Sequence, residues 1–206
     1  MNRYEAVLFD FDGVLVDSEP IHFDCWQEIL GPFGIDLDWD TYCEHCIGVT
    51  DRAMLAFLCT LSKTGVSIES LGAEYPRKKA MFRERMLKVD LAEDLRALIA
   101  ELKPHYKLGV VTSSNILEVG PFLEASGVMA SVDVVVHGGE VKHHKPHPEP
   151  YLLAVERLGV KSALAVEDSR AGIAAARAAG LDVVEIRDQR DVSNLVKAAV
   201  QSPPAV

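Results

Sequence analysis

The chain has 206 residues, of which 49% are hydrophobic and 25% are charged, and its formal net charge at pH 7 is −10. These values are typical of a soluble globular domain, alone or with one small additional unit. The negative charge argues against binding to nucleic acid or to an anionic membrane surface, although a local cation still permits an anionic small-molecule substrate.

No basic segment followed by a long apolar stretch marks a signal peptide, and no apolar run approaches the length of about 18 residues that a membrane span needs. The four cysteines are too few for a disulfide scaffold; they are Cys25, Cys43, Cys46 and Cys59. We therefore expect a cytoplasmic protein.

The first predicted element is a buried strand over residues 4–10, where an apolar run ends abruptly in an aspartate. Helical patterns follow, and Pro76 is expected to break or kink the last of them; they cover residues 18–30, 39–46, 50–61 and 67–88. Residues 17–90 are thus expected to form an inserted all-helical unit.

From Leu91 onward helices and strands alternate, which predicts crossover units and a parallel sheet. Helices are expected at 91–102, 116–125, 148–158 and 171–179, and strands at 107–112, 132–136, 163–166 and 183–186. The predicted fold class is α/β, with a doubly wound, Rossmann-like core formed by residues 1–16 and 91–206. Residues 201–205 are expected to be frayed.

Two carboxylates follow the first strand. Alternation places Asp10 and Asp12 on the same side of an extended chain, and Gly13 permits a sharp turn directly after them. Open α/β sheets bind ligands at this edge, and Mg²⁺ prefers one or two carboxylates together with phosphate oxygens. A turn stabilised by Asx side chains is the alternative interpretation.

Polar residues also follow three later strands. Thr112 is followed by Ser113, Ser114 and Asn115, whose hydroxyls and amides suit an anion, although one of the serines is also expected to cap the next helix. Lys145 follows the third strand. Glu167 and Asp168 end the fourth, where Asp168 or Ser169 is an alternative cap. Four acids, a lysine and a hydroxyl at one sheet edge suit phosphoryl transfer with a divalent cation.

Taken together, these motifs resemble those of the haloacid dehalogenase superfamily, and in particular its phosphatase and phosphomutase branch with a helical cap. Asp10 to Val14 is similar to the first motif of that family and Thr112 to the second. Lys145, in the stretch Lys145 to Tyr151, is similar to the third, and Glu167 to Gly172 to the fourth. The motifs occur in order and span nearly the whole chain.

The resemblance implies a role for each of these residues. Asp10 would be the nucleophile, Asp12 the general acid and base, and Thr112 and Lys145 would hold the phosphoryl group. Asp10, Asp168 and the Asp12 carbonyl would bind Mg²⁺, with Glu167 acting through water. Further phosphate contacts are expected from Gly13, Ser113, Ser114 and Asn115.

The inserted helices would be the cap, with substrate contacts from His22, Thr50 and Arg52. His22 falls where the β-phosphoglucomutase relatives also carry histidine, whereas Asp51 stands where those relatives place an arginine. The expected function is Mg²⁺-dependent hydrolysis of a small phosphate monoester, such as a sugar phosphate or a phosphoglycolate-like metabolite. A β-phosphoglucomutase-like phosphomutase and a non-catalytic binding protein are the alternatives, and a monomer is expected.

Two further patterns remain open. Cys43 and Cys46 have a spacing found in zinc and redox sites, although burial is the default state for cysteine. His143 and His144, with His147 nearby, suit a transition metal or are simply loop residues beside Lys145.

Overall fold

The computed structural model describes residues 3–201, so the segment expected to be frayed lies outside the described residues except for Gln201. Contacts within the chain define two compact units. One combines the residues up to Asp17 with those from Val89 onward, and the other is Ser18–Lys88. Within residues 3–201, no helix is both long enough and apolar enough to cross a membrane.

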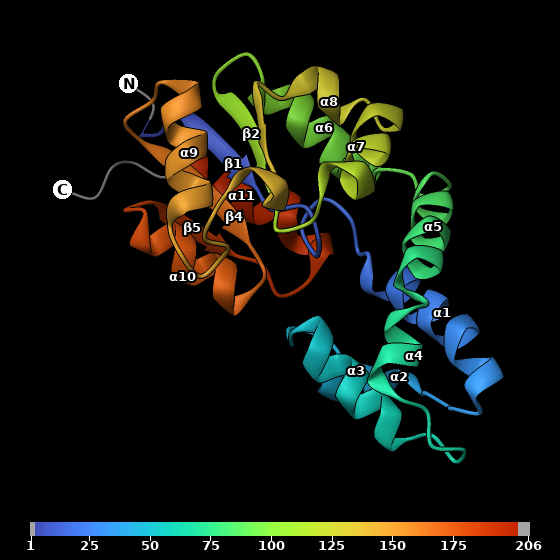
Figure 1. Cartoon of the computed structure of the whole chain (residues 1–206). Coiled ribbons are helices and arrows are strands. Elements are labelled where there is room, and N and C mark those ends of the chain that lie inside the picture. The colour runs from blue at the N-terminus through green and yellow to red at the C-terminus, as the bar shows by residue number, and fades with distance from the viewer. Residues whose placement is uncertain (1–2, 202–206) are drawn as a thin grey trace. The chain divides into compact units, whose positions relative to one another are not determined.

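The first unit is built on a parallel sheet of five strands in the order β3-β2-β1-β4-β5 (Figure 1). The strands are β1 (Ala6–Phe9), β2 (Lys107–Val111), β3 (Val134–Val136), β4 (Ala163–Glu167) and β5 (Asp182–Glu185). In the middle strand, Leu8 pairs with Gly109 of β2 and Ala165 of β4. All four residues of β1 are buried, as expected for a strand covered on both faces.

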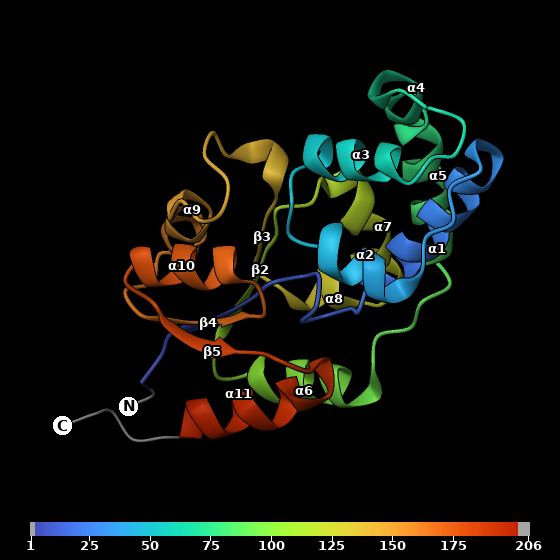
Figure 2. The same ribbon diagram turned by 90° about the horizontal axis from the view of Figure 1, so that it is seen from below.

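Helices cover both faces of this sheet, which confirms the doubly wound α/β fold. Helices α9 and α10 lie on one face, and α6 and α11 lie on the other (Figure 2). The helices of this unit are α6 (Glu93–Leu102), α7 (Ile116–Ala125), α8 (Val128–Ser131), α9 (Glu149–Leu158), α10 (Arg170–Ala178) and α11 (Val192–Gln201). Tyr151, Ala154 and Leu158 of α9 pack into a core cluster with Leu8 and Ala165.

Two of these helices were not predicted. The short helix α8 follows Gly127, whose φ of 79° is left-handed, and β3 begins at Val134, two residues after the expected residue 132. Helix α11 places Val192 and Val196 one helical turn apart, and both side chains are fully buried. This spacing of buried apolar residues is typical of an amphipathic helix that packs on a core.

The second unit is all-helical, as expected for this segment. Its elements are α1 (Glu19–Leu30), the 3₁₀ turn η1 (Gly31–Phe33), α2 (Trp39–His45), α3 (Asp51–Thr60), α4 (Ile68–Gly72) and α5 (Tyr75–Met86). Trp26, Ile29, Leu30, Leu55 and Leu58 form part of its own hydrophobic core.

The helical pattern over residues 67–88 forms two helices, α4 and α5, and the interruption between them lies just before Pro76, where a break or kink was expected. Pro76 lies in the first turn of α5, where its missing N–H costs nothing, so the second helix begins at Tyr75, just before the proline. Ser18 precedes α1 without a capping hydrogen bond from its side chain, unlike the cap expected there. Thr50 does cap α3 through its hydroxyl.

Candidate active site

Asp10 extends the central strand by one residue. Its backbone N–H donates to the carbonyl of Val166 at 2.9 Å, which fixes Asp10 beside the end of β4. Its carboxylate is almost enclosed, with 10% of the side chain exposed. Oδ1 accepts a hydrogen bond from the Phe11 amide at 2.8 Å and lies 3.0 Å from Lys145 Nζ. The strand therefore presents a buried, oriented carboxylate.

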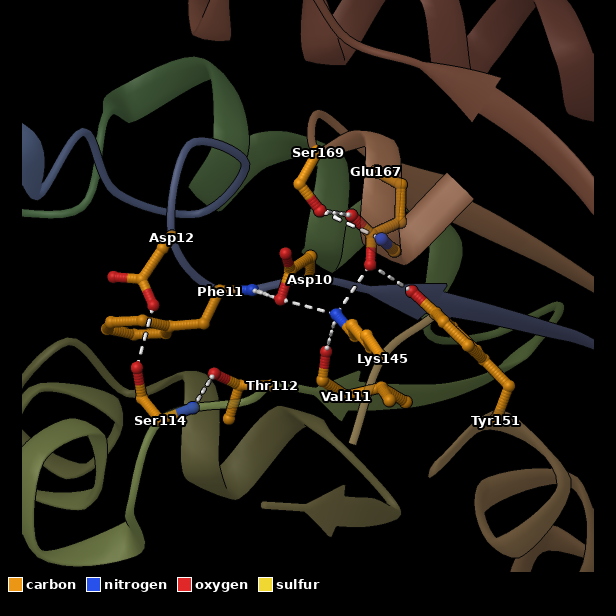
Figure 3. Close-up of polar contacts among 11 residues, drawn as sticks. Asp10, Phe11, Asp12, Val111, Thr112, Ser114, Lys145, Tyr151, Glu167 and Ser169 are labelled. Carbon is orange, nitrogen blue, oxygen red and sulfur yellow. Dashed lines mark hydrogen bonds and ion pairs between the residues drawn. The ribbon is translucent and has the colours of Figure 1, made fainter. Parts of the chain in front are cut away.

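Lys145 links the ends of the three central strands (Figure 3). It comes from the loop between β3 and α9, and only 4% of its side chain is exposed. Besides Asp10, its ammonium contacts the Val111 carbonyl at the end of β2 at 2.9 Å and Glu167 Oε1 at the end of β4 at 2.5 Å. Its positive charge is thus placed between two buried carboxylates.

Glu167 is fully buried, and both oxygens of its carboxylate accept hydrogen bonds. Oε1 accepts from the Tyr151 hydroxyl at 2.6 Å as well as from Lys145, and Oε2 accepts from the Ser169 hydroxyl at 3.2 Å. Gly172 leaves the space for this carboxylate, since a Cβ there would lie 2.0 Å from its atoms.

Tyr151 had no predicted role, although it stands in the same sequence motif as Lys145. Its position in the first turns of α9, which packs against the sheet, directs its hydroxyl toward the end of β4 (Figure 3). A buried tyrosine hydroxyl normally has a polar partner. A tyrosine in the same motif as Lys145 was therefore the signal in the sequence that could have identified this contact.

Asp12 and the residues after β2 form the other side of the site. Ser114 donates from its hydroxyl to Asp12 Oδ2 at 2.9 Å, and its amide donates to the Thr112 hydroxyl at 3.0 Å. Gly13 follows with φ 73°, and a Cβ there would lie 1.9 Å from Asp168 Oδ2. Only glycine therefore permits both this turn and the close approach of Asp168.

The charges in the site are unbalanced, because four carboxylates accompany one ammonium. Burial raises the pKa of Asp10 well above its usual value; Lys145 opposes this rise, while Glu167 and Asp12 add to it. Burial also works against the charge on Lys145, but Asp10 and Glu167 outweigh it and raise the pKa of the lysine. Partial burial of the Asp168 carboxyl removes some of its water. This desolvation, together with the negative charge of Glu167, raises the pKa of Asp168 to about 6.

The donor set fits a divalent cation. Asp10, Glu167 and Asp168 each offer an oxygen, and these atoms lie within 4.8 Å of one another. All three ligands are hard oxygen donors of the kind that Mg²⁺ accepts, and a divalent charge would relieve the repulsion that raises the carboxylate pKa values.

The remaining predicted phosphate ligands have different surroundings. Ser113 is exposed after β2. Asn115 is the cap of α7. Its side-chain oxygen accepts a hydrogen bond from the backbone amide of Leu117 at 3.0 Å, and its backbone amide donates to the Glu118 carboxylate at 3.4 Å. A cap was expected from one of the serines, and the structure assigns it to Asn115 instead.

The predicted substrate contacts of the helical unit lie at the starts of two helices. Thr50 and the exposed Arg52 are at the beginning of α3. His22 lies in α1, stacked on Phe82 with ring centroids 4.0 Å apart and hydrogen-bonded to Lys78. Burial and the neighbouring Lys78 lower the pKa of His22 to about 3.

Comparison with known proteins places the chain in a family. The family model of haloacid dehalogenase-like hydrolases matches residues 7–186. Fructose-1-phosphate phosphatase YqaB of Escherichia coli is 33% identical, with 90% of this chain and 97% of that protein covered. A phosphorylated carbohydrates phosphatase of Thermotoga maritima is 32% identical over 86% of this chain and 82% of its own length.

Solved structures agree with this assignment. A Thermotoga maritima protein with the provisional name β-phosphoglucomutase superposes with a TM-score of 0.77 and 28% sequence identity, covering 94% of this chain and 99% of that one. Sequence motifs, sheet order and relatives therefore coincide, and the chain belongs to the haloacid dehalogenase-like hydrolase family as an enzyme of its phosphatase type.

Proposed function

We propose that this enzyme hydrolyses small phosphate monoesters, such as sugar phosphates or phosphoglycolate-like metabolites, with Mg²⁺ and through an aspartyl-phosphate on Asp10. The single observation that carries the proposal is the buried contact of Asp10 with Lys145 at the carboxyl end of the central strand. The relatives named for fructose 1-phosphate and phosphorylated carbohydrates support the substrate class.

Asp10 is assigned the nucleophilic role because the Phe11 amide and Lys145 both hold its Oδ1 and so orient the carboxylate. Attack forms an oxygen–phosphorus bond to Asp10 and breaks the bond from phosphorus to the substrate alcohol, whose oxygen takes a proton from Asp12. Asp12 then removes a proton from water, which attacks the aspartyl-phosphate and releases inorganic phosphate. The Ser114 hydroxyl orients Asp12 for both transfers.

Asp10, Asp168 and the Asp12 carbonyl would hold the ion, with Glu167 acting through water. When bound, Mg²⁺ would neutralise charge on the phosphoryl group. Lys145 limits the repulsion between Asp10 and Glu167 and contributes positive charge for the phosphoryl oxygens.

Thr112, Ser113, Ser114 and the Gly13 amide are proposed to contact the phosphoryl group. Asn115 was predicted with them, but its side chain and its amide are both engaged in the cap of α7, so these contacts favour the structural role.

The helical unit, predicted over residues 17–90, is proposed to act as a cap that closes over the substrate and excludes water. His22, Thr50 and Arg52 would then select among phosphorylated substrates. A monomeric enzyme of the cytoplasm completes the proposal; light scattering measures the first property and cell fractionation the second.

The test is phosphate release from a panel of phosphate monoesters, with Mg²⁺ and with excess chelator, for the wild type and Asp10→Asn. Asp191→Asn, an exposed aspartate of the same unit, is the matched control. We expect metal-dependent release that Asp10→Asn abolishes and Asp191→Asn retains. Absence of release from every ester, in folded protein shown to bind Mg²⁺, would contradict the hydrolase proposal.

A phosphomutase is the second candidate, favoured by His22 and by the provisional name of the structural relative from Thermotoga maritima. In that reaction Asp10 passes the phosphoryl group to a sugar hydroxyl in place of water. Incubation of a sugar 1-phosphate with a bisphosphate primer separates the two: a mutase yields the isomeric sugar phosphate, whereas a phosphatase yields inorganic phosphate.

A further inference from the structure

A second group of metal-binding side chains lies on the loop that carries Lys145. His143, His147 and Glu149 each offer one ligand atom, and these atoms lie within 4.8 Å of one another. The group shares no residue with the acidic cluster at the strand ends. Because His143 precedes Lys145 by two residues and His147 follows it by two, the three side chains flank the lysine in the chain.

Glu149 is already held in position by the loop. It is the first residue of α9, and its Oε1 accepts from the Lys142 amide at 2.8 Å. Its Oε2 accepts from the His143 amide at 3.1 Å and lies 2.7 Å from His143 Nδ1. The carboxylate therefore loses little conformational freedom when a ligand binds, which favours affinity.

The two imidazole rings are also close. The ring centroids of His143 and His147 are 4.5 Å apart, with an angle of 31° between the ring planes. The Glu149 amide donates to His147 Nδ1 at 3.2 Å, so the same helix start positions this ring. Both rings and the carboxylate are thus arranged around one short segment.

Two imidazoles and one carboxylate favour a different kind of ion than the carboxylates of the acidic cluster do. Nitrogen ligands of this type suit Zn²⁺ and other late first-row transition metals, whereas Mg²⁺ takes oxygen ligands. We propose that His143, His147 and Glu149 bind one Zn²⁺-class ion, and that this ion fixes the loop from Lys142 to Glu149 around Lys145.

Binding requires a small movement. Two ligand atoms at about 2.0 Å from a tetrahedral zinc lie about 3.3 Å apart, whereas His143 Nδ1 and Glu149 Oε2 are separated by 2.7 Å. The ion therefore replaces the hydrogen bond between them and moves the two groups apart by about half an ångström. The His143 side chain is 62% exposed and has room for this shift.

The experiment is calorimetric titration of the full chain with Zn²⁺ in saturating Mg²⁺, which competes with Zn²⁺ for the acidic cluster. The test variant is His143→Asn/His147→Asn, in which each amide can replace the Nδ1 hydrogen bond of the histidine. His144→Asn is the matched control, because His144 is exposed in the same loop and is not in the ligand group. Hydrogen exchange of the 142–149 amides reports on the loop.

The proposal expects one equivalent of Zn²⁺ bound at micromolar protein, a loss of at least about 10-fold in affinity in the double variant, and none in His144→Asn. With Zn²⁺, the amides of 142–149 should exchange more slowly in the wild type and in His144→Asn, and at an unchanged rate in the double variant. Equal binding by the double variant, or an equal loss in His144→Asn, would overturn the site. In a parallel titration, Co²⁺ replaces Zn²⁺ as a coloured probe. A thiolate charge-transfer band in its absorption spectrum would also overturn the site, because it would assign the ion to cysteines. Unchanged exchange would overturn the effect on the loop.

Discussion

Removing the charge of Lys145 should destabilise the protein in a way that depends on pH. The ammonium lies 3.0 Å from Asp10 Oδ1 and 2.5 Å from Glu167 Oε1, and only 4% of its side chain is exposed. At an effective dielectric constant of about 20, each contact represents about 5–7 kcal/mol of Coulomb attraction. Desolvation offsets much of this attraction, and breaking such a buried pair costs about 3–5 kcal/mol.

The pH dependence follows from the carboxylates that remain. Burial already raises the pKa of Asp10, and Lys145 is the group that opposes this rise. In Lys145→Met the pKa of Asp10 should rise further, so between the unfolded and folded pKa values of this carboxyl the folded protein holds a proton that the unfolded chain has released. Since the folded state then binds more protons, its stability increases as the pH falls. The stability deficit of the variant relative to the wild type should therefore shrink as the pH falls.

Urea denaturation of the wild type and Lys145→Met in chelator measures this effect. The double variant Lys145→Met/Glu167→Gln is the control, because it also removes one of the two unpaired buried charges. We expect the double variant to be more stable than Lys145→Met alone, with a coupling of about 1–3 kcal/mol. A deficit below about 1 kcal/mol that is constant with pH, or a double variant less stable than the single one, would refute the electrostatic argument.

Three further variants test individual contacts by urea denaturation. Gly172→Ala should lower the free energy of unfolding by about 1–3 kcal/mol, because the new Cβ would lie 2.0 Å from the Glu167 carboxylate. Gly120→Ala in α7 is its control. The Cβ there meets side-chain atoms no nearer than 3.6 Å, so this variant should be neutral or stabilising. Tyr151→Phe should lose about 1.5–3 kcal/mol, since it removes a 2.6 Å hydrogen bond to Glu167 and retains the ring. Asn115→Ala should lose about 1 kcal/mol with its cap of α7, and an unchanged midpoint would contradict that assignment.

The sequence by itself was sufficient for the fold class, and it placed the candidate site at one edge of the sheet. Apolar runs that end in Asp10, Thr112 and Glu167 identify parallel strands, and parallel strands bring their carboxyl ends to one edge. The same periodicity separated the helical segment from the α/β core. These properties depend on local patterns of burial, which a single chain records directly.

Only the tertiary structure decided which partners these residues take. Lys145 pairs with Asp10 and Glu167, and Tyr151 reaches Glu167 from α9, because packing of the loop and helix fixes distances near 3 Å. Sequence spacing determines the order and direction of side chains but not separations on that scale.

The same reason explains the details that prediction missed. Three polar residues before α7 suit a cap, and the turn geometry selects Asn115. The break expected at Pro76 within 67–88 was confirmed, but the exact end of α4 at Gly72 and the start of α5 at Tyr75 were not predicted. Helix α11 is stabilised by burial of Val192 and Val196 against a core that the local sequence does not contain. Local geometry that spacing does not resolve decides the cap and the helix ends, contacts between distant segments decide α11, and local periodicity decides the fold class.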